Sequence, residues 1–194
     1  MTSLRIAQDP DADRVLSQSS FALLAGMMLD QQFPMERAFA GPAKILERFG
    51  SLDPVAIADA GPDEFAALCI KPPAIHRFPG SMAARVQAMA ATIATTYGGD
   101  TARLWNEAAS GRELLARIND LPGFGAQKSR IFVALLGKQL GVRPAGWQAA
   151  AGSYAEEGIF TSVADVTGPD ALAKVRAYKK DTKDKRAAGG QSAG

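Results

Sequence analysis

Apolar residues recur along most of this chain at the three- and four-residue spacing of helices. No stretch alternates convincingly with the period of two that a half-buried strand requires. Within 79–97, one stripe formed by Val86, Met89, Ile93 and Tyr97 predicts a long helix with one buried face. The pattern therefore predicts an all-α fold.

The segment 19–29 differs because it is apolar on every face. Such a helix belongs in the middle of a core, where it has no side to turn to water. Ser19 and Ser20 stand where a helix cap is needed, and they are suited to accept the first free N–H groups. We expect this helix to be the centre of the protein.

Proline and glycine mark the boundaries of the remaining predicted helices. Further helices are expected at 35–49, after Asp53-Pro54, after Gly61-Pro62-Asp63, at 112–119, at 126–140 and at 170–185. From 141 to 168 the periodicity weakens, and we expect irregular structure there. The end, 187–194, has the composition of a disordered tail, which leaves a single helical domain over 1–186.

The stretch LPGFGAQKS, residues 121–129, joins two of these helices. Gly123 and Gly125 permit positive φ and a close approach of another molecule to the backbone. We expect the N–H groups of residues 124–128 to point out of a helix start, where the partial positive charge favours an anion. Lys128 would add a cation to this phosphate site. An ordinary turn between two helices is the alternative.

Leu121-Pro122-Gly123-Phe124-Gly125 resembles the hairpin of the helix–hairpin–helix (HhH-GPD) DNA glycosylases, the superfamily that includes endonuclease III. Asp30-Gln31-Gln32 resembles the glutamine motif of the same family, and order and spacing agree over 19–140. The resemblance implies a two-lobed helical bundle with its hairpin at 113–140, which binds double-stranded DNA for base excision. It implies DNA contacts by Gln31, Gln32, Gly123, Phe124, Gly125, Ala126, Gln127 and Lys128.

Two further roles come from the resemblance alone. In the family a glutamine side chain enters the space that a flipped base leaves, and Gln32 matches that position. The alternative for Gln32 is a helix-end residue that bonds to exposed carbonyls. Hairpin carbonyls of the family also hold a monovalent cation, and the matching carbonyls here belong to Asn119, Leu121 and Phe124. Nothing in these residue types demands the ion.

The sequence departs from the family where its chemistry is expected. The catalytic Asp of the family would fall at or beside Ala145-Gly146, where no acid stands. The Lys nucleophile of bifunctional members aligns with Gln127. Lys128 is turned by about 100° around the helix, so we expect it to point elsewhere and we expect no lyase step. Cys69 is the only cysteine, which excludes an iron–sulfur cluster, and no other cofactor is expected.

Four other acids are candidate replacements for the missing catalytic group: Asp30, Glu156, Glu157 and Asp165. A carboxylate is needed because cleavage of a glycosidic bond builds positive charge on the sugar. Each candidate has a structural alternative: a helix-end turn for Asp30, loop solvation for the glutamates and a cap for Asp165.

Three aromatic residues, Trp147, Tyr154 and Phe160, fall in the segment expected to be irregular. Aromatic faces stack on unpaired bases, so these side chains are candidates for a base pocket. Anchoring of the loop to the core is the alternative.

Composition adds little beyond this. The formal net charge is only +2, but basic residues crowd the C-terminal end, which suggests an anionic partner or else a solvated tail. His76 is the only histidine and is expected to be structural. The longest apolar run is too short to span a membrane and no secretory signal is evident, so we expect a cytoplasmic protein that associates with the nucleoid when it binds DNA. We also expect a monomer.

Two functions remain open from the sequence. The first is a monofunctional DNA glycosylase with a substituted acid, which would release a labile base such as an alkylated purine. The second is a binding module that recognises distorted or flipped DNA and performs no chemistry. The hairpin supports both, and the missing Asp favours the second. A helical protein that uses the turn only structurally is a third reading.

Overall fold

The computed structural model describes residues 3–189, which form helices and loops and contain no strand. The α-helices are α1 (Pro10–Gln18), α2 (Ser20–Leu29), α3 (Met35–Phe39), α4 (Gly41–Phe49), α5 (Pro54–Asp59), α6 (Pro62–Ile70), α7 (Pro79–Tyr97), α8 (Arg103–Asn106), α9 (Gly111–Asn119), α10 (Ala126–Gln139), α11 (Trp147–Ala151) and α12 (Pro169–Gly189). Two short 3₁₀ segments, η1 (Gly152–Ala155) and η2 (Val163–Asp165), precede α12. The predicted all-α fold is confirmed.

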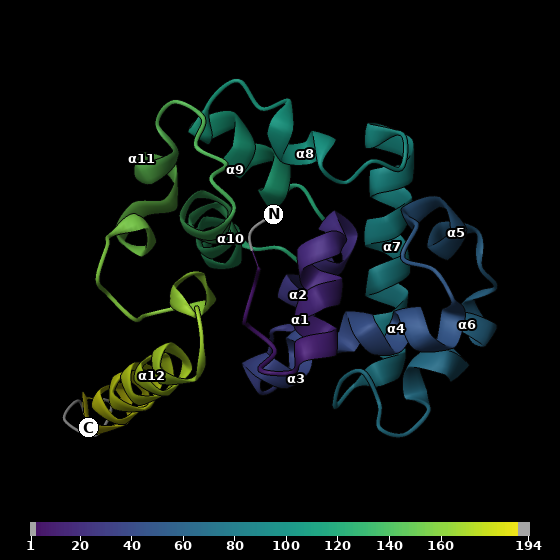
Figure 1. Cartoon of the computed structure of the whole chain (residues 1–194), viewed down its shortest axis with the longest axis horizontal. Coiled ribbons are helices and arrows are strands. Elements are labelled where there is room, and N and C mark those ends of the chain that lie inside the picture. Colours follow the sequence, from purple (N-terminus) through teal and green to yellow (C-terminus); the bar gives the residue numbers. More distant parts are fainter. Residues whose placement is uncertain (1–2, 190–194) are drawn as a thin grey trace.

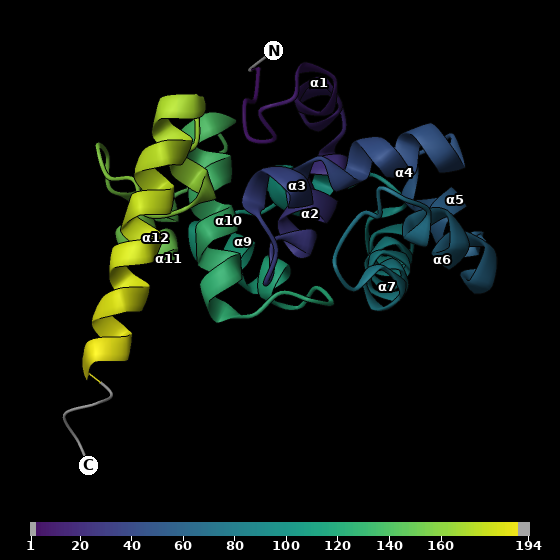
Figure 2. The same ribbon diagram turned by 90° about the horizontal axis from the view of Figure 1, so that it is seen from below.

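The helices gather on two sides of α2 (Figure 1). On one side α5 and α6 pack on α7, and α4 packs on α6. On the other side α9, α10 and α11 pack together with the 3₁₀ segments. Figure 2 shows α12 running along this second group and continuing beyond it. No helix in the described part of the chain has the length and apolarity needed to cross a bilayer.

The helix α2 lies in the core as its pattern predicted. Every residue from Phe21 to Leu29 is buried, because the helix has no polar face to expose. Ser19 caps it, since its Oγ accepts the N–H of Ala22 at 3.1 Å. The long helix α7 also has its predicted bounds, and Gly98, with a φ of 64°, ends it.

The predicted helix over 35–49 is wrong, because the structure divides it into α3 and α4 at Ala40. Pro42 causes the break: it has no N–H and suits only the first turn of a helix, where it now stands in α4. Gly41 fits the junction closely, since a Cβ at this position would lie 2.6 Å from Cδ1 of Leu29.

Three other expectations need correction. The segment 141–168 contains α11 and both 3₁₀ segments, so it is less irregular than its weak periodicity suggested. Residues 187–189 belong to α12, whereas 190–194 of the expected disordered tail lie outside the described residues. The helix α1 was not predicted, although Asp9-Pro10 carries the same start signal as Asp53-Pro54, and Asp9 caps it.

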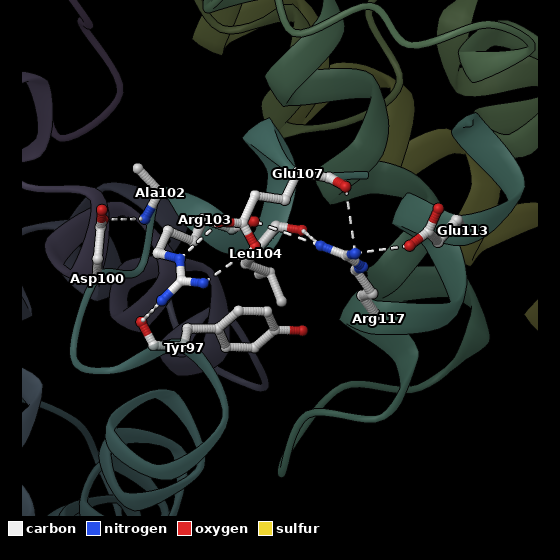
Figure 3. Close-up of polar contacts among 8 residues, drawn as sticks. All are labelled: Tyr97, Asp100, Ala102, Arg103, Leu104, Glu107, Glu113 and Arg117. Atoms are coloured by element: carbon white, nitrogen blue, oxygen red, sulfur yellow. Dashed lines mark hydrogen bonds and ion pairs between the residues drawn. The ribbon is translucent and has the colours of Figure 1, made fainter. Parts of the chain in front are cut away.

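Partly exposed ion pairs and hydrogen bonds to backbone carbonyls hold the connection between the two groups of helices (Figure 3). The Arg117 guanidinium on α9 donates to the Glu113 carboxylate at 2.6 Å and to the Glu107 carbonyl at 3.2 Å. Arg103 on α8 donates to the Glu107 carboxylate at 2.6 Å and to the Tyr97 carbonyl at 3.2 Å. The end of α7, the short α8 and α9 are thereby held together, and α9 carries the hairpin.

Replacement of Arg117 by Ala is expected to lower the free energy of unfolding by about 2 kcal/mol, because the carbonyls at the end of α8 lose a charged donor. Urea denaturation followed by circular dichroism measures this change. Arg112→Ala on the same helix is the matched control, since that residue is exposed. An equal effect of both variants would show that the Arg117 contacts contribute nothing specific.

Candidate nucleic-acid interface and active site

The turn between α9 and α10 presents its backbone outward. Leu121 and Phe124 are buried beneath it, and Gly123, Gly125, Ala126 and Gln127 are exposed. Gly123 has a φ of 83°, and a Cβ there would lie 3.0 Å from Cγ of Met28, so this position requires glycine. The two apolar anchors and the close approach to α2 fix the hairpin rigidly on the core.

The exposed amides begin one residue later than the sequence suggested. The N–H of Phe124 donates to the Leu121 carbonyl at 3.1 Å, so it is used within the turn. The first bond of α10 runs from Ser129 N–H to the Gly125 carbonyl at 2.9 Å. The N–H groups of Gly125, Ala126, Gln127 and Lys128 precede that bond and have no partner within the helix. These donors and the helix dipole make an anion site.

The Lys128 side chain does not lie where the sequence placed it. Its Nζ donates to the Met28 carbonyl at 2.9 Å, at the end of α2. Burial lowers its pKa to about 8, although the negative charge of Asp30 acts in the opposite direction. Lys128 thus points in a different direction from Gln127, which reaches Tyr154, as its place on the helix predicted, but it still reaches the end of α2. Its expected contact with a hairpin phosphate gains no support from this geometry.

The two glutamines after α2 have different surroundings. Gln31 is held on both sides, because its Nε2 donates to the Met28 carbonyl at 2.8 Å and Arg85 donates to its Oε1 at 3.0 Å. Gln31, and not Gln32, thus bonds to a carbonyl at the helix end. Gln32 is exposed and has a φ of 51°, a left-handed conformation that costs a non-glycine residue of order 1 kcal/mol.

His76 anchors this loop and has the structural role expected of it. Its Nε2 donates to the Gln31 carbonyl at 2.9 Å, because its Nδ1 accepts the N–H of Phe78 at 3.1 Å. The ring is buried, and burial lowers its pKa. Both nitrogens are occupied, which leaves neither for proton transfer to a ligand.

Acidification through about pH 6.5 is expected to destabilise the protein, because the unfolded chain binds a proton at His76 before the folded chain does. The stability that the neutral ring contributes is complete above that pH and falls as the pH drops towards the folded pKa. Urea midpoints at about pH 7.5 and about pH 5.5 measure the loss. His76→Phe should lack this slope, and an undiminished slope in that variant would contradict the assignment.

A cavity of about 570 Å³ lies where the end of α2, the start of α10, η1 and α12 meet. Its wall consists of Met27, Asp30, Gln31, Gln32, Phe33, Gln127, Lys128, Ile131, Tyr154, Thr161, Tyr178, Lys179, Thr182 and Lys183. Asp30 is the single acid of this wall. Burial raises the pKa of its carboxyl, an effect that the positive charges of Lys179 and Lys128 partly oppose.

The other three candidate acids do not line this cavity. Asp165 completes a capping box with Ser162 and pairs with Lys138 at 2.6 Å, so it is a structural cap, as the alternative reading had it. Glu156 and Glu157 are exposed. The structure therefore brings only Asp30 together with the glutamines and the hairpin helix.

The geometry agrees with the family comparison. The family model described as HhH-GPD superfamily base excision DNA repair protein matches residues 25–190. The chain belongs to the HhH-GPD superfamily of base excision DNA repair proteins. No curated relative and no solved structure matched the chain.

The departure from the HhH-GPD pattern is visible in the structure. Ala145-Gly146, where the sequence comparison expected the family's acid at or nearby, lies at the start of α11: Gly146 is its N-cap with a φ of 78°, and the Ala145 carbonyl accepts the N–H of Gly111. Gln127, at the position of the family's lysine, donates from Nε2 to the Tyr154 hydroxyl at 3.0 Å. Both family positions are thus occupied by residues that cannot perform the family's reactions.

The aromatic candidates divide between the two expected roles. Trp147 is an anchor: a Cβ on Gly137 would lie 2.3 Å from its ring, so the indole fills a slot that only glycine leaves open. Phe160 packs partly on the core and lies under the Lys174 ammonium at 4.4 Å. Only Tyr154 of the three lines the cavity.

Sequence reasoning missed the contribution of α12 to the cavity, which consists of Tyr178, Lys179, Thr182 and Lys183. The crowding of basic residues at this end was the signal, but it does not say where the helix docks.

The cation that the family holds at its hairpin stays a prediction. The Leu121 carbonyl already accepts one hydrogen bond and retains a second lone pair for such an ion, and Asn119 and Phe124 lie in the same turn.

Proposed function

We propose that this HhH-GPD protein is a monofunctional DNA N-glycosylase that acts on duplex DNA, with Asp30 as its catalytic carboxylate. The observation that carries the proposal is the place of Asp30, which lies in a cavity beside the glutamine loop and the hairpin helix. The hairpin amides hold the strand by a phosphate, and the target base is rotated out of the stack at a cost of a few kcal/mol.

The chemistry assigned to Asp30 follows from its surroundings. Loss of the base leaves positive charge on the sugar, and a nearby carboxylate stabilises that charge or removes a proton from the attacking water. Burial raises the pKa of Asp30, which makes the carboxylate a better base near neutral pH than an exposed one. Gln32 fills the gap in the duplex in this proposal, and its strained, exposed backbone supports the assignment.

The test is release of a free base. The protein is incubated with duplexes that contain uracil, hypoxanthine, an alkylated purine or 8-oxoguanine, and the released base is identified by mass spectrometry. Release from any of these duplexes that is lost in Asp30→Asn supports the proposal. Release that survives in this variant would place the catalytic group elsewhere.

Lys128 requires a separate experiment, because its position in the cavity and its pKa of about 8 leave a fraction of neutral amine at physiological pH. A neutral amine attacks the aldehyde of an abasic site and forms a Schiff base. A monofunctional enzyme gives no adduct when borohydride is added to the protein with an abasic duplex. A covalent adduct that disappears in Lys128→Gln would replace the monofunctional assignment with a lyase.

The alternative is a non-catalytic module that recognises lesions. The absence of an acid at Ala145-Gly146 favours it. Tight binding to an abasic-site analogue, with no base released from any duplex, would establish this alternative.

A further inference from the structure

The cavity beside Asp30 is rich in positive charge. Three ammonium groups, those of Lys128, Lys179 and Lys183, face one carboxyl in its wall. The positive charge of these lysines opposes the entry of a cationic guest. It does not oppose the entry of a neutral or electron-rich guest.

Several hydrogen-bond donors of the wall are free to bind a guest. Lys128 uses one N–H on the Met28 carbonyl and retains others, and an ammonium donates but never accepts. The Tyr154 oxygen accepts from Gln127, which leaves its own O–H as a donor. The hydroxyl of Thr161 is buried and has no hydrogen-bond partner in the described part of the chain. A buried hydroxyl without a partner is suited to bind a guest.

The Phe33 ring of the cavity wall offers no free face to a cationic guest. A cation binds well over a free aromatic face, but the Phe33 ring already lies under the Arg37 guanidinium at 5.2 Å and packs on His76 at 4.6 Å. Phe33 therefore cannot bind a second cation beside Asp30, the single acid of the wall.

Damaged bases also differ in charge and in the hydrogen-bonding groups that they carry. Deamination replaces an exocyclic amino group, which donates, with a carbonyl, which accepts. It turns cytosine into uracil, adenine into hypoxanthine and guanine into xanthine, all of them uncharged or electron-rich. Alkylation at N7 of guanine or N3 of adenine instead gives a base with a positive charge.

We propose that this cavity selects neutral, carbonyl-bearing bases of the deaminated class and rejects cationic alkylated purines. The inference rests on the proposed function to the extent that the cavity receives a flipped base. It reverses the expectation, based on leaving-group chemistry alone, that an alkylated purine is the substrate.

Binding tests the proposal without requiring catalysis. Duplexes carry uracil, hypoxanthine or 7-methylguanine on a 2′-fluoroarabinose sugar, which resists cleavage. Each lesion is placed opposite the same abasic analogue, so that the cost of opening a base pair does not contribute to the measured affinity. Fluorescence anisotropy gives each affinity relative to an undamaged duplex. We expect uracil or hypoxanthine to be preferred over 7-methylguanine by at least about tenfold.

Charge reversal on α12 supplies the matched variants. The double variant Lys179→Glu with Lys183→Glu changes two cavity residues, and it should abolish or invert the preference. The control Lys180→Glu with Lys185→Glu makes the same change of total charge at exposed positions outside the cavity wall, and it should keep the preference.

Equal or tighter binding of 7-methylguanine by the unaltered protein would overturn the proposal, and so would a preference that survives the Lys179 and Lys183 reversal. The outcome is independent of turnover. If no duplex with an ordinary sugar releases its base while the binding preference persists, the glycosylase assignment fails and the selectivity of the cavity stands.

Discussion

Asp30→Asn is expected to reduce base release by about 10³-fold, because a positioned acid or base contributes roughly 10² to 10⁴ in rate. Affinity for an abasic-site duplex should change little, since the hairpin amides are untouched. Asn has nearly the same shape, and the backbone N–H of residue 30 still bonds to the Gly26 carbonyl. Single-turnover release measured beside anisotropy separates the loss of chemistry from any loss of binding.

The same substitution should not destabilise the fold. The pKa of Asp30 is raised in the folded state, so the charged carboxyl opposes folding at neutral pH and this cost disappears as the pH falls below the unfolded value. We expect Asp30→Asn to unfold at or above the wild-type temperature at pH 7. Glu157→Gln, an exposed acid outside the cavity, is the control and should keep full activity. A variant that is both unstable and inactive would reveal a structural role for Asp30.

Gly125→Asp is expected to weaken binding to every duplex by about 10- to 100-fold at low salt while it leaves the fold intact. Gly125 is the N-cap of α10, has an extended φ of −110° and offers open space for a Cβ. An Asp there caps the helix and stabilises it by a few tenths of a kcal/mol relative to Gly. The same carboxylate occupies the amides that would bind a phosphate and repels the strand.

The neutral variant Gly125→Asn separates these two effects, because it caps the helix without adding charge. Its affinity should lie between those of wild type and Gly125→Asp. Gly123 is a poorer target, since its φ of 83° and its contact with Met28 would confuse strain with loss of binding. Wild-type affinity of Gly125→Asp at low salt would show that the hairpin amides do not contact DNA.

The local parts of the fold could be predicted because their signals are local. Pro79 and Gly98 bound α7, Ser19 caps α2, and Gly123 has the positive φ that glycine permits, although Gly125 has an extended φ of −110°. The division of 35–49 was missed because its apolar stripe continues through Pro42. The spacing of apolar residues gives no sign that Pro42 lacks the N–H a continuous helix would need there.

The candidate site was harder to predict because it depends on where distant segments meet. Helix geometry correctly predicts that the side chains of Gln127 and Lys128 leave the helix in different directions. It does not predict which other segment each side chain meets, and that segment is the end of α2 for Lys128. The Met28 carbonyl that draws Lys128 inward lies 100 residues earlier in the chain. The docking of α12 is likewise a long-range packing result that its basic composition does not encode.

One wall of the cavity comes from α12, the final helix in the described part of the chain, and the strand-gripping turn lies some fifty residues earlier. Under the proposed function, α12 therefore contributes to the choice of lesion but not to the backbone amides that hold the strand, although Gln127 and Lys128 take part in both. Substitutions in α12 would then change which damaged base is accepted, while the phosphate-binding turn before α10 kept its hold on the duplex.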